Sequence, residues 1–172
     1  MLRRPDRLAL VIVLEGILST LLAFVLGQRF TGLFHHGSAM IGGLWAGISA
    51  VVVLQGTLRD TRKAALLRVA STFVGALVCA IYLWLFPFSI VGIALCVGVT
   101  ILICHVFNIF EYARLACAAV LVIAVVSQET PGVSPFLNAF LRFMEATIGV
   151  AVTVGTVFVL HRFARRTAAS GW

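Results

Sequence analysis

Long apolar runs alternate with short polar connections along this chain of 172 residues. Because the hydrocarbon layer of a bilayer is about 30 Å thick, a helix of about 20 apolar residues can cross it. The pattern therefore predicts an all-α, polytopic membrane protein whose single domain covers residues 1–172 and holds about six transmembrane helices. The predicted spans are residues 8–27, 38–55, 58–85, 89–107, 114–127 and 136–160.

The second and third predicted spans carry the clearest local signals. Gly43 and Gly47 form a small-xxx-small pair, a spacing that lets two membrane helices approach to backbone contact. Thr57 opens a capping box in which Asp60 is expected to reach back, so a new helix should begin directly after the threonine. Two interpretations stay open for the short, glycine-rich span 38–55: it crosses the membrane fully, or it is broken or re-entrant.

The same region resembles a known family. The run WAGISAVVVLQGTLRDT (residues 45–61), followed by ALLRV (65–69) and GAL (75–77), looks like the signature region of the fusaric acid resistance and aromatic acid exporter family. Aluminium-activated malate channels are more distantly similar. Gly56 stands where that family usually has proline, and the resemblance covers about residues 8 to 80.

The resemblance carries functional expectations. It implies an exporter of small organic anions, with aromatic carboxylic acids as the main class, in a bacterial inner membrane. Because members of the family commonly hold two six-helix halves in one chain, it also implies that this single unit works as a homodimer.

The distribution of charge along the sequence bears on the partners of the protein and on its orientation in the membrane. The formal net charge is +7, but the basic residues cluster between apolar runs, where they meet anionic lipid head groups, so we expect the lipid bilayer and no nucleic acid as partner. Of the 13 lysines and arginines, all but Arg29 and Arg142 fall on one side of the predicted topology. Basic residues favour the cytoplasmic side, so both termini are predicted to be cytoplasmic.

The sequence lacks the usual signatures of catalysis. No histidine and carboxylate surround a serine, and no glycine-rich phosphate loop is present, so we expect no enzyme and no cofactor. The four cysteines lie in apolar runs without the spacing of a zinc site, which predicts buried small hydrophobic residues and no metal. They are Cys79, Cys96, Cys104 and Cys117.

Glu15 is the sharpest candidate for chemistry. It lies two turns into the first predicted span, with no basic residue within four positions, and a carboxylate at membrane depth needs a partner or a route to water. It is either a proton acceptor that couples transport to the proton gradient or a hydrogen-bonded residue that holds helices together. His161, at the end of the sixth predicted span, is expected only to anchor that end.

Basic residues supply the candidates for binding an anion. Arg142 and Glu145 lie three positions apart on the sixth predicted span, close enough to pair across one turn. They form either a structural ion pair or a substrate site, in which Arg142 holds a carboxylate and Glu145 accepts a proton. Arg59 and Arg62 either anchor the cytoplasmic turn or draw anions to an inner mouth.

Three hypotheses for function remain. The first is a secondary exporter of organic anions, with coupling to protons left open. The second is a passive anion channel, and the third is a membrane subunit that transports nothing and scaffolds a partner. The substrate, the direction of transport and the coupling ion are left open by the sequence.

Overall fold

The computed structural model describes residues 7–130 and 132–169, and the side chains of residues 10–130 and 132–162. These residues form six α-helices and two 3₁₀ turns, so the predicted all-α class is confirmed. The elements are α1 (Arg7–Phe34), η1 (His36–Ser38), α2 (Ala39–Val53), α3 (Leu58–Leu85), α4 (Ile90–Val106), η2 (Phe110–Tyr112), α5 (Ala113–Glu129) and α6 (Pro135–Ala169). Of the two tails predicted to be cytoplasmic, residues 1–7 and 161–172, positions 1–6 and 170–172 lie outside the described residues.

Most of these helices are long and apolar enough to cross a membrane. Among the described residues, five helical stretches meet both conditions, while α4, with 17 residues, is apolar but shorter. At about 1.5 Å per residue α4 is roughly 25 Å long, against a hydrocarbon layer of about 30 Å. Large apolar side chains are exposed along α1 and α4, as on a surface that meets lipid.

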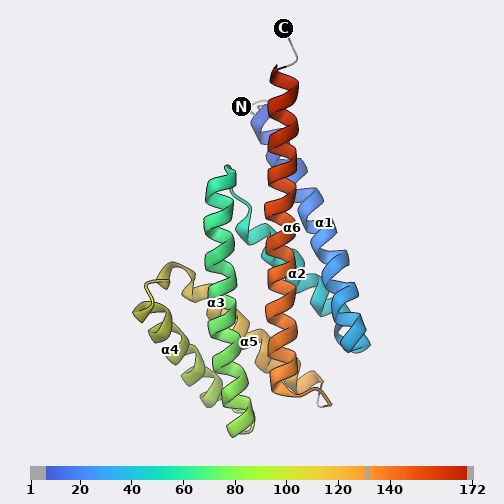
Figure 1. The fold of residues 1–172 in the computed structure, drawn as a ribbon. Helices are drawn as coiled ribbons and strands as arrows, with labels where there is room; N and C mark the ends of the chain where they lie inside the picture. Colours follow the sequence, from blue (N-terminus) through green and yellow to red (C-terminus); the bar gives the residue numbers. More distant parts are fainter. Residues whose placement is uncertain (1–6, 131, 170–172) are drawn as a thin grey trace, which may run out of the picture.

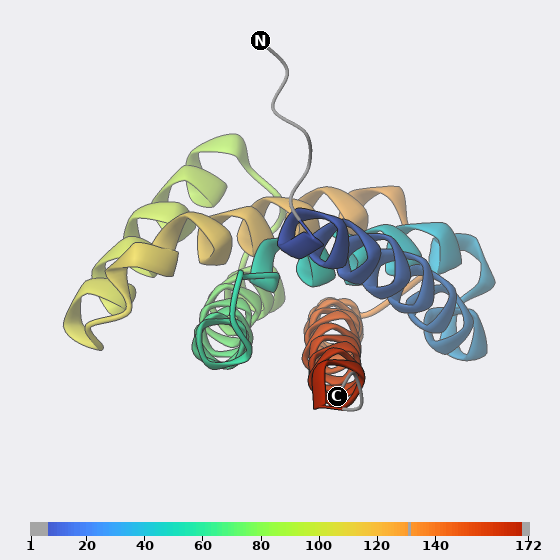
Figure 2. The same ribbon diagram turned by 90° about the horizontal axis from the view of Figure 1, so that it is seen from above.

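The helices form two groups around a central pair. α3 and α6 run side by side in opposite directions (Figure 1). Seen from above, α4 and α5 flank α3, while α1 and α2 flank α6 (Figure 2). The start of α1 and the end of α6 lie at the same end of the bundle (Figure 1).

Helix α1 is longer than the sequence predicted. The predicted span ended at Gly27 and was followed by an outer loop over residues 28–37, but α1 continues to Phe34. The two polar residues after Gly27 lower the hydropathy, yet neither is a helix breaker. The rings of Phe30 and Phe34, one turn apart, also contact each other, with centroids separated by 5.2 Å. The predicted loop is therefore wrong over most of its length.

One face of α1 is buried along nearly the whole helix. Every fourth residue on this face is inaccessible, which is the spacing of one helical stripe. The stripe consists of Glu15, Ser19, Ala23, Gly27 and Thr31. Because α1 packs against α2 and α6, the stripe forms a seam between α1 and those two helices.

The capping motif starts α3 where it was predicted. The amide of Asp60 donates to the hydroxyl of Thr57 at 3.2 Å, and α3 begins at Leu58. The carboxylate of Asp60 does not reach a backbone amide, since it accepts from the hydroxyl of Thr57 at 2.6 Å. This local pairing sets the start of the helix that crosses the centre of the bundle.

Helix α2 is continuous and packs closely on α6. A Cβ atom at Gly149 would meet the carbonyl of Ala46 and lie 3.1 Å from the backbone nitrogen of Ala50. Glycine therefore lets the two backbones touch, as small residues do between membrane helices. The hydroxyl of Thr153, one turn farther along α6, donates to the carbonyl of Ala50 at 3.1 Å. The described part of α2 gives no sign of a break.

The small-residue pair of α2 faces α1. A Cβ atom at Gly43 would lie 2.9 Å from the carbonyl oxygen of Phe24, which is closer than ordinary contact. At Gly47 the nearest atom is a ring carbon of Phe24 at 3.7 Å, which is ordinary van der Waals contact. The backbone approach is therefore tighter at Gly43.

The largest difference at the other helix ends concerns α6. It was predicted over residues 136–160, whereas the helix runs over Pro135–Ala169, because its basic C-terminal part continues the helix after the apolar run ends. The ends of α2, α4 and α5 differ from the predictions by one or two residues, and α3 has the predicted bounds.

Candidate functional site

Four charged residues are fully buried among the described helices. They lie on α1, α3 and α6, and each has at most 1% of its surface exposed: Glu15, Arg68, Arg142 and Glu145. A charged side chain at membrane depth is costly, by a few kcal/mol on insertion scales, unless a partner or a route to water compensates it. Their surroundings therefore define the candidate site.

Arg142 and Glu145 form an ion pair on α6. The Nη1 atom of Arg142 lies 2.8 Å from the Oε2 atom of Glu145, and both side chains are 0% exposed. The Nε and Nη2 atoms of the guanidinium have no hydrogen-bond partner among the described residues. The pair is the one that the three-residue spacing suggested, and it leaves Arg142 with capacity for a further acceptor.

A hydroxyl from α1 holds the other side of Glu145. Thr31 donates a hydrogen bond to Oε1 of the carboxylate, across 114 positions of the chain. Gly42 of α2 lies against this bond, since a Cβ atom there would meet the Thr31 hydroxyl and lie 2.8 Å from Oε1 of Glu145. Three helices therefore converge on the Glu145 carboxylate.

Glu15 has a partner on another helix. Nε2 of His161 on α6 lies 3.3 Å from Oε1 of Glu15, close enough for an ion pair when the imidazole is protonated. Glu15 is completely buried, whereas His161 is 27% exposed. His161 also lines a small cleft together with Leu58 and Phe158. His161 was expected only to anchor the helix end, but it connects a buried carboxylate with that cleft.

The two buried acids lie at opposite ends of the same seam. Glu15 is level with His161 on α6, and Thr31 is level with Glu145. Sixteen residues separate each pair along its helix, so the two carboxylates are about 24 Å apart along the bundle. They cannot share one binding site.

Arg68 is a buried cation that the pattern of the sequence did not single out. Its Nη2 atom donates to the hydroxyl of Ser49 at 3.1 Å, and its guanidinium carbon lies 5.1 Å from the ring centre of Trp45. Its Nε and Nη1 atoms have no partner among the described residues. Charge counting placed Arg68 in the cytoplasmic turn, whereas α3 carries it into the core. The small residues on the same face, Ala64 and Ala65, could have indicated this.

Arg59 and Arg62 lie apart from the buried charges. Both are exposed, in the first two turns of α3. Leu58, at the start of α3, shares a cleft with Phe158 of α6, and Phe158 is sixteen residues beyond Arg142. The distance along α6 is therefore about 24 Å. Arg59 and Arg62 therefore lie at the end of the bundle where α3 begins, too far away to contact an anion bound at Arg142.

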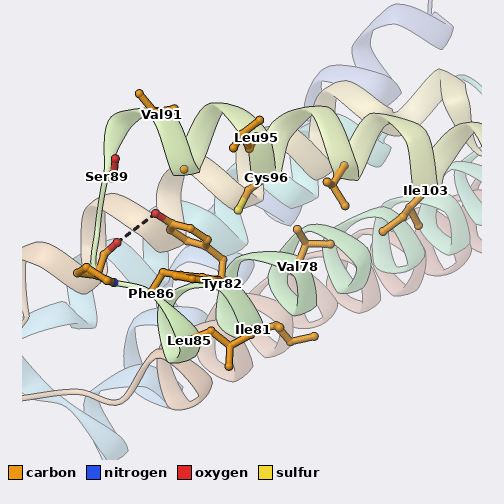
Figure 3. Close-up of a pocket in the computed structure, with 13 residues that line it drawn as sticks. Val78, Ile81, Tyr82, Leu85, Phe86, Ser89, Val91, Leu95, Cys96 and Ile103 are labelled. Carbon is orange, nitrogen blue, oxygen red and sulfur yellow. Dashed lines mark hydrogen bonds between the residues drawn. The ribbon is translucent and has the colours of Figure 1, made fainter.

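Two apolar clefts lie on the α4 side. One, of about 730 Å³, is formed between α3 and α4, with Val78, Leu95 and Cys96 among its lining residues (Figure 3). Tyr82 lines it but turns its hydroxyl to the carbonyl of Pro87, at 3.0 Å (Figure 3). The other, also about 730 Å³, lies between α4 and α5. Neither includes the buried charges.

A bundle of apolar helices that encloses ion pairs defines a multi-pass helical membrane protein. The chain matches the family described as fusaric acid resistance protein-like over residues 18–155, and it belongs to that family. The match confirms the predicted family, while the similarity to malate channels stays a prediction. Comparison with curated proteins and with solved structures gave no match. The family is one of membrane transport and not of enzymes, which supports a transporter or exporter.

Proposed function

We propose that this chain is a proton-coupled secondary exporter of small organic anions, chiefly aromatic carboxylates, in a bacterial inner membrane. The observation that carries the proposal is the fully buried Arg142–Glu145 pair, held to α1 by Thr31. Buried pairs of this kind are rarely the most stabilising choice for a membrane core, and intramembrane charges mark transport paths. The substrate class rests on the resemblance to aromatic acid exporters.

Arg142 is the proposed carboxylate-binding residue. Its planar guanidinium has unfilled donors beside the ion pair with Glu145, and a substrate carboxylate can accept from them. When the substrate displaces Glu145 from Arg142, the hydrogen bond from Thr31 still holds the displaced carboxylate. Arg142 can therefore exchange the carboxylate of Glu145 for that of the substrate without leaving either carboxylate unpaired.

The two buried acids are the proposed proton carriers. In the outward step the carrier with bound substrate moves the organic anion out of the cytoplasm. In the return step Glu15 or Glu145 takes up a proton, so the empty carrier that moves back carries one proton inward with it. His161, which lies beside Glu15 and is partly exposed, gives that proton an exit to the solvent at the cytoplasmic end. Arg59 and Arg62 gather anions at the mouth near the start of α3.

Orientation and assembly complete the proposal. The exposed arginines at the start of α3 favour the cytoplasm for that end of the bundle, which is also where α1 begins and α6 ends (Figure 1). The membrane potential, negative inside, then favours exit of an anion by about 2.3 kcal/mol per 100 mV. Two copies of this six-helix unit would supply the two halves that family members commonly hold in one chain.

A flux assay tests the function. Purified protein is placed in liposomes with an imposed pH gradient, and efflux of benzoate, salicylate, acetate and succinate is measured. Native protein is compared with Glu15→Gln, Glu145→Gln and Arg142→Ala. Arg29→Ala is the matched control, because Arg29 is an exposed arginine on α1.

We expect benzoate flux that rises with the gradient, is lost in Arg142→Ala and loses its dependence on the gradient in the glutamine variants. Ohmic flux that ignores the proton gradient would instead indicate a channel. Native flux no greater than that of empty liposomes would refute transport and favour a scaffold. If the three variants match native flux, the assigned residues are wrong.

A further inference from the structure

We propose that Arg68, with Trp45 beside it, binds the carboxylate group of a small organic anion inside the bundle. The inference rests on the proposed function, because it adds a second anion-binding position to the same transport path. Its starting point is a charge balance in the core: Arg142 has Glu145, and Glu15 has His161, but Arg68 has no counter-ion among the described residues.

None of the acidic side chains that the structure describes pairs with Arg68. Glu15 and Glu145 are occupied on the α1–α6 seam, and Asp60 caps α3. Glu111 and Glu129 are exposed at the two ends of the α5 region. An uncompensated guanidinium that is 1% exposed is costly in such a core. A bound anion would remove that cost.

The unfilled donors are suited to a carboxylate. Nε and Nη1 of Arg68 have no partner in the described part of the chain, and neither does the indole nitrogen of Trp45. The hydroxyl of Thr72, one turn along α3 from Arg68, is also buried without a partner. Ser49 fixes the guanidinium through Nη2, while its own hydroxyl donates to the carbonyl of Trp45 at 2.9 Å. The donors are therefore held in place before a ligand arrives.

The surroundings suit an organic rather than an inorganic anion. Trp45 packs with two alanines, Ala119 of α5 and Ala146 of α6, so its ring is bordered by small apolar side chains. An organic acid whose carboxylate binds Arg68 would place its apolar part beside this aromatic ring. Aromatic acids should bind more tightly than acetate for that reason.

The position of Arg68 fits a path through the bundle. Phe73 of α3 contacts Phe143 of α6, with ring centroids 5.6 Å apart. On these antiparallel helices Arg68 is thus within about one helical turn of the level of Glu145. Trp45 contacts Arg68 on one side and packs with Ala146, the neighbour of Glu145, on another. An anion that leaves Arg68 has Arg142 as the next guanidinium in the core.

The test uses the purified full chain in detergent and measures thermal unfolding with increasing benzoate, and separately with acetate. Variants are Arg68→Met, Arg68→Lys and Trp45→Phe, with Arg114→Met as control for an exposed arginine. We expect benzoate to raise the melting temperature of the native protein and of the control. Arg68→Met should weaken benzoate binding about 10- to 100-fold, the usual effect of losing a hydrogen bond to a charged group.

A second readout separates binding from structure. If Arg68 serves an anion, Arg68→Met should leave the empty protein as stable as the native protein or more stable, because an uncompensated charge has gone. Arg68→Lys, which keeps the charge and the fold, should retain weakened binding. Benzoate stabilisation that is absent in the native protein, or undiminished in both Arg68 variants and Trp45→Phe, overturns the inference.

Liposome flux then distinguishes this inference from the proposed function. Binding that depends on Arg68 without any transport supports the anion site and refutes the exporter. Transport of benzoate that is unaffected by Arg68→Lys and Arg68→Met supports the exporter and refutes the site at Arg68.

Discussion

Replacing Gly42 by alanine should disrupt the junction of three helices at Glu145. The added Cβ atom would meet the Thr31 hydroxyl and lie 2.8 Å from the Oε1 atom of Glu145. Thr31 can move away only by giving up its hydrogen bond to the carboxylate. If it stays, the core is overpacked.

Either route costs about 1–3 kcal/mol, through a lost hydrogen bond to a charged group or through overpacking. The higher helix propensity of alanine offsets at most about 1 kcal/mol. We therefore expect Gly42→Ala to lower the free energy of unfolding by about 1–2 kcal/mol. For a chain of this size that corresponds to a fall in melting temperature of about 2–8 °C.

The matched control is Gly47→Ala, on the same helix. Its Cβ atom would lie 3.7 Å from a ring carbon of Phe24 and 3.8 Å from a methyl carbon of Thr20, so it fits without displacement. Thermal unfolding of both variants, followed by tryptophan fluorescence in detergent, gives the comparison. Equal melting temperatures for Gly42→Ala and Gly47→Ala would show that the contact at Glu145 does not constrain the packing.

Three further variants test single contacts. Thr31→Val keeps the shape of the side chain but removes the donor to Glu145, so benzoate flux should fall at least several-fold with little change in folding; unchanged flux would contradict the role of Thr31. His161→Gln should leave anion binding intact but reduce the dependence of flux on the pH gradient, measured with the same liposomes, because Glu15 loses its partly exposed neighbour. Thr57→Ala removes the cap of α3 and should lower stability by about 1 kcal/mol, read as a lower melting temperature, without affecting transport in the surviving folded protein.

Local features of this fold were predictable from sequence, and long-range ones were not. The start of α3 follows from a threonine and an aspartate three positions apart, so neighbouring residues contain the information. The end of α1 was misplaced because two polar residues interrupt the hydropathy without interrupting the helix. Hydropathy measures preference for lipid, whereas the helix continues for as long as backbone geometry and packing allow.

The candidate site shows the same division. The spacing of Arg142 and Glu145 on one helix was enough to suggest a pair. The contact between Thr31 and Glu145 joins residues 114 positions apart, and no periodicity in one sequence reports it. Arg68 was assigned to the cytoplasm by its charge, although its place on the small-residue face of α3 carries it inward.

The seam between the two buried acids has a consequence for energy conservation. Over its 24 Å or so, a chain of waters able to relay protons would need on the order of eight molecules. Within this interval Gly27 lies so close to α2 that a Cβ atom there would be 2.7 Å from the carbonyl oxygen of Gly42, which leaves no room for a water molecule at that point. The stripe therefore interrupts any continuous chain of waters between the two acids. A proton can then be held at either end without leaking through the protein and dissipating the gradient that drives transport.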